Sequence, residues 1–293
     1  MKKQGMIVKS IGGFYDVEAA EAVYTCRAKG VLRTQNISPL VGDRVMFSIY
    51  ENGLCSVDEI LPRRNELVRP PVANLDQLVL VLSTSDPGPN LTLVDTLIAI
   101  AEYKDVSPIV VITKIDLEDG AWIKQIYDTA GIPCFILSNL QSPKPDDLIG
   151  LFAQKITAFT GNTGVGKSSL LNLLSEDLHL PVGDISKKLG RGRHTTRHTE
   201  LFKLFGGYIA DTPGFSMLDL AQYEYIPKEQ LAYCFREFEP FLGDCKFSDC
   251  SHIKEHGCSV TAAVGQGTIS QSRYESYCYL YNEVKDQKEW QKK

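Results

Sequence analysis

A glycine-rich segment, residues 161–168, has the residue types and the spacing that bind a phosphate chain. It reads Gly-Asn-Thr-Gly-Val-Gly-Lys-Ser, and in such loops the backbone N–H groups and the start of the next helix surround the phosphate oxygens. Lys167 would reach the β- and γ-phosphates as a catalytic cation, and the Ser168 hydroxyl would complete the coordination of Mg²⁺. The residues predicted to contact the phosphates are Gly161, Asn162, Thr163, Gly164, Val165, Gly166, Lys167, Ser168 and Ser169.

A second polar segment, Thr113-Lys-Ile-Asp116, resembles the guanine-recognition motif Asn/Thr-Lys-x-Asp of GTP-binding proteins. Guanine presents two adjacent donors, N1–H and the 2-amino group, and the Asp116 carboxylate could accept both hydrogen bonds. Adenine lacks this arrangement, and a site built around such a polar group can reject the wrong base by roughly 10⁴-fold. Lys114 would pack along the base and the ribose. We predict that Thr113, Lys114, Ile115 and Asp116 bind the base; the alternative is a solvated loop.

The segment 184–199 contains two glycines and five basic residues, and it shows no apolar periodicity. It lies between the phosphate-loop helix and the next predicted strand, which is the place of switch I in GTPases. We predict that Thr196 closes on Mg²⁺ and the γ-phosphate, and the sequence leaves the neighbouring Thr195 as an alternative. His194 is the candidate helper in hydrolysis; the alternative is a solvated histidine of a basic loop.

A predicted strand pair, 201–205 and 207–210, leads into Asp211-Thr-Pro-Gly214. We predict that Asp211 holds Mg²⁺ through water and that the Gly214 N–H senses the γ-phosphate. Phe215 occupies the position where many GTPases carry a water-orienting glutamine. A phenyl ring cannot orient water, so hydrolysis must be slow, helped by another residue or completed by a partner.

Four residues near the C-terminus have the spacing of a tetrahedral zinc site: Cys245, Cys250, His252 and Cys258. Four protein ligands leave no open coordination position, so one structural zinc ion is expected. His256 is an alternative ligand, and chance clustering of buried cysteines is the alternative interpretation. The other cysteines lack comparable spacing and are expected to be small buried side chains.

The flanking periodicity predicts the elements that hold these residues. Residues 1–70 contain short runs of strand-forming residues between turn signals, which predicts an all-β, OB-like barrel that contacts either nucleic acid or protein. Arginines and prolines around residues 62–71 mark a stiff, basic linker. Buried strands then alternate with helices over 71–218, as in an α/β P-loop domain with a parallel sheet. Residues 219–293 are expected to form a mainly α zinc-binding module.

Composition agrees with an ordinary globular protein. The chain has 293 residues, of which 43% are hydrophobic and 23% charged, and its net charge of −5 gives no global reason to expect nucleic acid. The apolar runs are too short to span a membrane, and the N-terminus lacks the apolar run of a signal peptide. We therefore expect a cytoplasmic protein without a membrane partner, and a monomer is the working expectation.

The order of the motifs is unusual, because the guanine motif precedes the phosphate loop, whereas most GTPases have the reverse order. The α/β domain is therefore expected to be circularly permuted, which a parallel sheet tolerates when its strands keep the same neighbours. The phosphate loop, Gly192-Arg-His-Thr-Thr196, Asp211-Thr-Pro-Gly214 and the cysteine spacing together resemble the bacterial YjeQ/RsgA family over essentially the whole chain. These are ribosome small-subunit-dependent GTPases.

The resemblance implies GTP hydrolysis to GDP and phosphate, stimulated by the small ribosomal subunit. It also implies rRNA contact through the barrel and the zinc module, and a role in late maturation of the small (30S) subunit. Two other functions remain open from the residues alone. One is a nucleotide-dependent scaffold that binds a protein partner and hardly hydrolyses; the other is a P-loop ATPase or kinase, which Asp116 disfavours.

Overall fold

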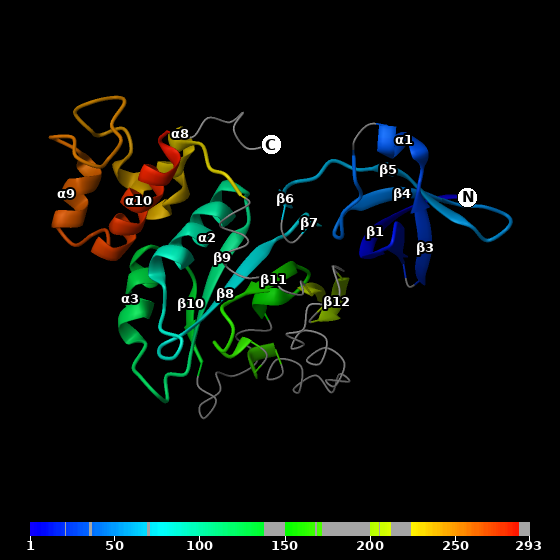
Figure 1. Ribbon diagram of the computed structural model, residues 1–293, viewed down its shortest axis with the longest axis horizontal. Helices are drawn as coiled ribbons and strands as arrows, with labels where there is room; N and C mark the ends of the chain where they lie inside the picture. The colour runs from blue at the N-terminus through cyan, green and yellow to red at the C-terminus, as the bar shows by residue number, and fades with distance from the viewer. Residues whose placement is uncertain are drawn as a thin grey trace. The chain divides into compact units, whose positions relative to one another are not determined.

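The computed structural model describes residues 1–20, 22–34, 37–68, 71–137, 150–167, 169–171, 200–204, 206–211 and 224–286 (Figure 1). The chain divides into two compact units. Unit 1 contains residues 1–78, 144–159 and 167–215, and unit 2 contains residues 79–143, 160–166 and 216–293. Each unit therefore combines segments that are distant in the sequence. None of the described helices is long and apolar enough to cross a lipid bilayer.

The N-terminal part of unit 1 is a closed barrel of five strands, as predicted. Its strands pair in the order β1-β2-β3-β5-β4, and β4 pairs again with β1. The long strand β1 closes the barrel because residues 2–6 pair with β4 and residues 6–11 pair with β2. The elements are β1 (Lys2–Ile11), β2 (Phe14–Ala19), β3 (Ala22–Ala28), α1 (Gly30–Thr34), β4 (Arg44–Ile49) and β5 (Cys55–Ile60). The core side chains without exposed surface include Ile7, Val17, Cys26, Val45, Phe47 and Val57.

Two arginines of the predicted linker, Arg63 and Arg64, are bound to carboxylates within unit 1. Arg63 donates two hydrogen bonds to the buried Asp43, at 2.7 and 2.8 Å. Arg64 pairs with Asp76 at 2.8 Å. Two short strands, β6 (Glu66–Leu67) and β7 (Val72–Ala73), form an antiparallel pair in the same stretch. These two positive charges therefore fasten the segment after the barrel to its own unit.

The rest of unit 1 contains the strand that precedes the glycine-rich loop and the predicted hairpin. β11 (Ile156–Thr160) runs parallel to β13 (Gly207–Asp211), and β12 (Glu200–Leu204) runs antiparallel to β13. β12 also meets the barrel, because Lys9 of β1 lies opposite Glu200 and forms an ion pair with it at 3.0 Å. The barrel therefore contacts the hairpin that ends at Asp211.

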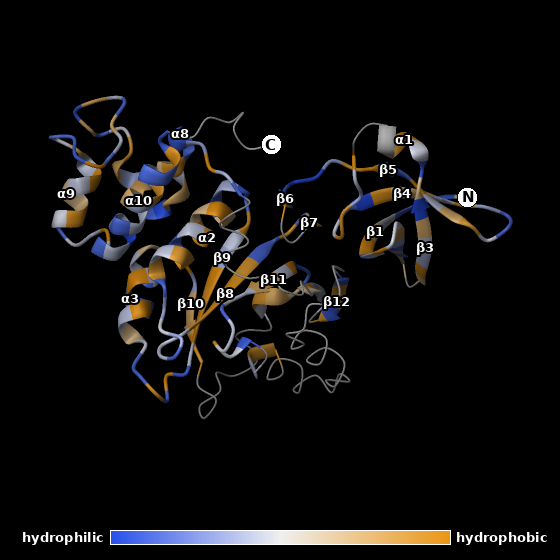
Figure 2. Cartoon of the chain, viewed as in Figure 1, coloured by the Kyte–Doolittle hydropathy of each residue, from blue (hydrophilic) through white to orange (hydrophobic). Residues whose placement is uncertain are grey.

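Unit 2 contains the predicted alternation of strands and helices. Its strands are β8 (Gln77–Ser83), β9 (Ser107–Thr113) and β10 (Cys134–Ile136), in the order β10-β9-β8, and β9 and β10 are parallel. Between them lie α2 (Leu91–Tyr103) and α3 (Ala121–Thr129). α2 begins where the Asn90 side chain accepts a hydrogen bond from the Leu93 N–H at 3.1 Å. Figure 2 shows the hydrophobic colour over most of these strands, as expected for strands buried on both faces.

The C-terminal part of unit 2 is mainly helical, as predicted. It contains α8 (Lys228–Leu231), the 3₁₀ turns η1 (Ala232–Cys234) and η2 (Arg236–Phe241), α9 (Ser259–Gly265) and α10 (Gln271–Val284). α10 packs along α2 (Figure 1). Three aromatic rings form the centre of this part, with the Tyr277 ring 5.3 Å from Phe235 and 4.9 Å from Phe238 between centroids.

A buried guanidinium joins the C-terminal part to α2. Arg273 of α10 donates a hydrogen bond to Asp95 of α2 at 2.7 Å and one to Glu237 of η2 at 2.7 Å. Its guanidinium carbon lies 4.6 Å from the centroid of the Phe235 ring. Burial alone would lower the pKa of Arg273, but the carboxylates of Asp95 and Glu237 raise it above its usual range. The arginine is therefore charged, and three elements depend on its charge.

Arg273→Met is expected to lower the free energy of unfolding by about 3–5 kcal/mol, because it leaves two carboxylates buried without their counter-ion. Urea unfolding followed by circular dichroism measures this loss. The matched control is Arg236→Met, which removes a half-exposed arginine bound to Glu102 and should cost about 1 kcal/mol or less. Equal losses in the two variants would contradict the special role of the buried arginine.

Candidate functional site

The glycine-rich loop lies against the end of β8 within unit 2. A side chain at Gly161 would place its Cβ 2.6 Å from the Val81 carbonyl oxygen and 2.9 Å from a Val165 methyl group. Gly164 and Gly166 have φ values of +88° and +90°, a conformation that other residues rarely adopt. The sequence therefore needs glycine here for close approach and for the turn. Such a turn can present its backbone N–H groups to an anion.

The glycine-rich loop and the predicted guanine loop meet at Thr113. The Thr113 hydroxyl, at the end of β9, lies 2.5 Å from the Val165 carbonyl oxygen and 3.0 Å from the Leu82 carbonyl oxygen. The side chain is buried, so this contact is shielded from water. The structure thus brings 113–116 and 161–166 together, although 44 residues separate Asp116 from Gly161 (161 − 116 − 1 = 44).

The other residues of the predicted guanine loop are more open. Asp116 is exposed, and Lys114 and Ile115 are half-buried. The Lys114 ammonium donates a hydrogen bond to the Asp86 carbonyl oxygen at 2.6 Å. The segment 83–90 therefore forms a further wall beside the two loops. Its role was missed from the sequence, although its position just past the carboxyl end of a buried strand is the place where ligands of α/β sheets bind.

Several predicted site residues lie outside the described part of the chain. Lys167 and Ser169 are described in the helical turn that follows the loop, and Leu170 and Leu171 in the same turn are buried. Asp211 is described as the last residue of β13, without its side chain. The predicted residues outside the description are Ser168, His194, Thr195, Thr196, Gly214 and Phe215. Their roles, including both protein ligands of Mg²⁺, stay predictions.

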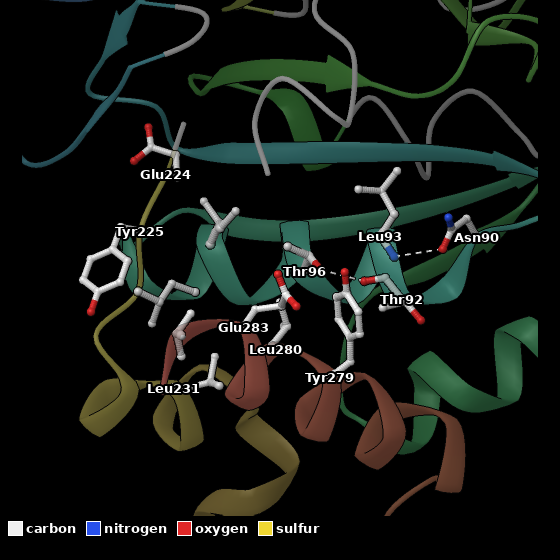
Figure 3. A pocket seen from close by; sticks show the side chains of 13 residues that line it. Asn90, Thr92, Leu93, Thr96, Glu224, Tyr225, Leu231, Tyr279, Leu280 and Glu283 are labelled. Carbon is white, nitrogen blue, oxygen red and sulfur yellow. Dashed lines mark hydrogen bonds between the residues drawn. The ribbon is translucent and has the colours of Figure 1, made fainter. Parts of the chain in front are cut away.

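A cavity of about 540 Å³ lies elsewhere in unit 2, between α2, α10 and residues 224–226 (Figure 3). Its walls combine apolar side chains such as Leu93 and Leu280 with the carboxylates of Glu224 and Glu283. No residue of 113–116 or 161–166 lines it. The cavity is therefore separate from the two loops that the sequence predicts to bind the nucleotide.

The four predicted zinc ligands meet in space. The Sγ atoms of Cys245, Cys250 and Cys258 and a ring nitrogen of His252 lie within 4.8 Å of one another. Cys245 Sγ is 3.9 Å from Cys258 Sγ, and both are 3.5 Å from His252 Nδ1. A tetrahedral zinc ion with ordinary bond lengths separates two sulfurs by roughly 3.8 Å and a sulfur from a nitrogen by roughly 3.6 Å. The cluster therefore fits zinc.

The surroundings of the cluster favour metal-binding protonation states in two of its residues. Burial lowers the pKa of His252, so its imidazole is neutral near pH 7, which is the form that binds a metal. Burial would raise the pKa of Cys245, but the hydrogen bond with the Ser259 hydroxyl at 3.0 Å lowers it overall. In the metal-free protein, burial raises the pKa of Cys250 to about 12. Zinc would have to displace that proton on binding.

Glu255 holds the backbone on both sides of His252, and the sequence reasoning missed it. Its carboxylate accepts hydrogen bonds from the N–H groups of Ser251 at 2.8 Å and of Ile253 and Lys254 at 3.0 Å. Burial alone would raise the pKa of Glu255, but these bonds and the Ser251 hydroxyl lower it to about 2. His252 has a φ of +60°, so the loop needs such support.

Along the chain, the closed barrel comes first, the guanine-type loop 113–116 second and the phosphate-type loop 161–168 third, and this order is typical of one class of protein. With the guanine loop ahead of the phosphate loop, the class is a circularly permuted P-loop GTPase with an N-terminal barrel. Residues 60–221 match the RsgA GTPase family, and residues 4–56 match the RsgA N-terminal domain. The chain belongs to the RsgA GTPase family.

Relatives cover nearly the whole chain. "Small ribosomal subunit biogenesis GTPase RsgA" of Caldanaerobacter subterraneus subsp. tengcongensis is 43% identical, over 97% of this chain and 96% of its own. The protein of the same name from Enterococcus faecalis is 43% identical, over 99% and 98%. The crystal structure of YloQ, a circularly permuted GTPase, has a TM-score of 0.79 at 36% identity, over 98% and 96%. YjeQ from Thermotoga maritima has a TM-score of 0.80 at 31% identity, over 98% and 100%.

Gly161→Ala is expected to weaken GDP binding roughly tenfold or more, because the added methyl group must displace the loop from the Val81 carbonyl. Fluorescence titration with a labelled GDP measures the change. Gly88→Ala is the control in the neighbouring segment, since a Cβ there meets no atom within 4 Å. Unchanged GDP affinity in Gly161→Ala would contradict the assignment of this loop to the nucleotide.

Glu255→Ala is expected to lower zinc affinity roughly tenfold or more, because the loop that carries His252 loses its shared acceptor. Competition with a chromogenic zinc chelator measures this without any GTPase assay. Glu275→Ala is the control, because this exposed carboxylate accepts only a side-chain hydrogen bond, from Gln271 at 2.9 Å. Equal zinc retention in both variants would show that Glu255 does not support the site.

Proposed function

We propose that this protein hydrolyses GTP to GDP and phosphate, that the small ribosomal subunit stimulates the reaction, and that it acts in late maturation of that subunit through rRNA contacts. The observation that carries the proposal is the contact between Thr113 and Val165, which joins a guanine-type loop to a phosphate-type loop. Membership of the RsgA GTPase family and the names of relatives along the full chain support the same reaction and the same particle.

In this proposal the backbone of Gly161–Gly166 and the Lys167 ammonium bind the phosphates, and Asp116 accepts two hydrogen bonds from guanine. Mg²⁺ enters with GTP, and Ser168 and Thr196 supply its protein ligands, while Asp211 acts through water. When bound, the ion neutralises charge that develops on the phosphates. The Gly214 N–H reports the γ-phosphate. These assignments follow from the residue types and their order in the chain.

The catalytic machinery of the free protein is incomplete in this proposal. Phe215 stands where a glutamine orients water in many GTPases, so basal hydrolysis is slow. His194 is proposed to orient the water when the protein is bound to the ribosomal subunit. Binding of the small ribosomal subunit would thereby be coupled to GTP hydrolysis. GTP would remain bound and unhydrolysed until the protein binds the subunit.

We propose a different role for each of three parts of the chain. The barrel, residues 1–70, and the zinc module, residues 219–293, contact rRNA, and residues 71–218 carry out hydrolysis. One zinc ion on Cys245, Cys250, His252 and Cys258 is structural, since four protein ligands leave no open position. We propose that the protein is a monomer in the cytoplasm, where small ribosomal subunits are assembled. We also propose that it has no membrane partner.

The deciding measurement is steady-state GTP hydrolysis with and without purified small ribosomal subunits, repeated at raised salt. We expect strong stimulation that falls with salt, because cations compete for the rRNA phosphates. Large ribosomal subunits are the control. Equal, slow rates in every mixture would favour a nucleotide-dependent scaffold instead. Asp116→Asn should shift the preference from GTP to xanthosine triphosphate, whereas unchanged preference would refute the guanine site.

A further inference from the structure

Thr84 lies directly after β8 and faces the guanine loop. The residue is buried, with 4% of its surface exposed. Its N–H donates a hydrogen bond to the Thr113 carbonyl oxygen at 3.1 Å, and its hydroxyl donates one to the Lys114 carbonyl oxygen at 2.8 Å. One residue thus binds two consecutive carbonyl groups of the loop. The first bond lies at the end of the neighbouring strands β8 and β9, whereas the second is made by a side chain and acts on the loop residue Lys114.

The loop needs support at Lys114. This residue has a φ of +59°, a left-handed conformation that residues with a side chain rarely adopt. The Lys114 carbonyl also accepts the N–H of Leu117 at 2.9 Å, which closes the turn that contains Asp116. The carbonyl that Thr84 binds is therefore the acceptor that closes the turn 114–117, which contains Asp116.

The segment that begins at Thr84 also binds the side chain of Lys114. The ammonium donates to the carbonyl oxygen of Asp86, two residues after Thr84, at 2.6 Å. The Thr84 methyl group lies close to the backbone of Gly120, where an added Cβ would be only 3.0 Å from it. The backbone and the side chain of Lys114 are thus held by one short segment, 84–86, which is buried at Thr84 and exposed at Asp86.

We propose that Thr84 is a positioning residue that sets guanine specificity, because its hydroxyl holds Lys114 in the conformation that directs Asp116 toward N1–H and the 2-amino group. The inference rests on the proposed guanine site. It does not require Thr84 to touch the nucleotide. Loss of the hydroxyl would leave the phosphate loop unchanged and would weaken the discrimination between bases.

The test compares GDP with IDP, which lacks the 2-amino group, by calorimetric titration of the full chain. Thr84→Val keeps the shape and removes the hydroxyl, and it should weaken GDP binding about five- to tenfold and IDP binding much less. Thr84→Ser keeps the hydroxyl and should retain the GDP preference within about twofold. The proposal would be overturned if Thr84→Ser lost as much of the preference for GDP over IDP as Thr84→Val, or if Thr84→Val kept that preference unchanged.

A double-mutant cycle with Asp116→Ala separates specificity from general stability. If Thr84 acts through Asp116, Thr84→Val should have no further effect on the GDP-to-IDP ratio in the Asp116→Ala background. Additive effects would mean that Thr84 acts by another route, and would overturn the proposal. The wild-type protein tests the underlying site separately, because equal binding of GDP, IDP and ADP there would refute the guanine site itself.

Discussion

The contact of the Thr113 hydroxyl with the Val165 carbonyl oxygen, 2.5 Å long and buried, holds together the two loops of the predicted nucleotide site, and the rest of that site depends on it. Circular permutation puts the guanine loop ahead of the phosphate loop along the chain, so no short peptide connects them in the usual order. Their relative position must therefore come from packing. A threonine can serve at position 113 of the motif, where asparagine is more common, because a hydroxyl group and an amide group can both donate a hydrogen bond to a carbonyl oxygen. Water cannot compete with it at a buried position.

The permutation also decides what the two ends of the nucleotide-binding part are attached to. The chain enters from the barrel, and the barrel in turn contacts the β12–β13 hairpin through Lys9 and Glu200. The chain leaves toward the zinc module, whose helix α10 is fixed to α2 by Arg273. An ordinary order of motifs would place the chain ends elsewhere. The two proposed rRNA-contacting parts are thus each tied, by an ion pair, to an element of the fold that carries the site.

Periodicity and motif spacing predicted the fold class well, because buried strands, glycine turns and metal-ligand spacings are local signals. The alternating strands and helices that begin with β8 and the cysteine cluster lie where the sequence placed them. Three features depended on distant contacts and were missed. β1 is a single strand that closes a barrel from both sides. Arg63 and Arg64, read as linker charges, are bound to Asp43 and Asp76. The supports at Thr84 and Glu255 act on backbone groups, which no side-chain motif reveals.

Helix α2 connects these parts in a way that a list of motifs does not suggest. Its last turn is followed by Lys104, which binds the buried carboxylate of Glu224 at 2.9 Å, the first described residue after the Asp-Thr-Pro-Gly segment. Its middle carries Asp95, the partner of Arg273. A helix moves as a rigid body over this length, so a displacement at Lys104 is also a displacement at Asp95. Because the buried carboxylates of Glu224 and Asp95 resist separation from their partners, α2 links residue 224 mechanically to helix α10 of the zinc module.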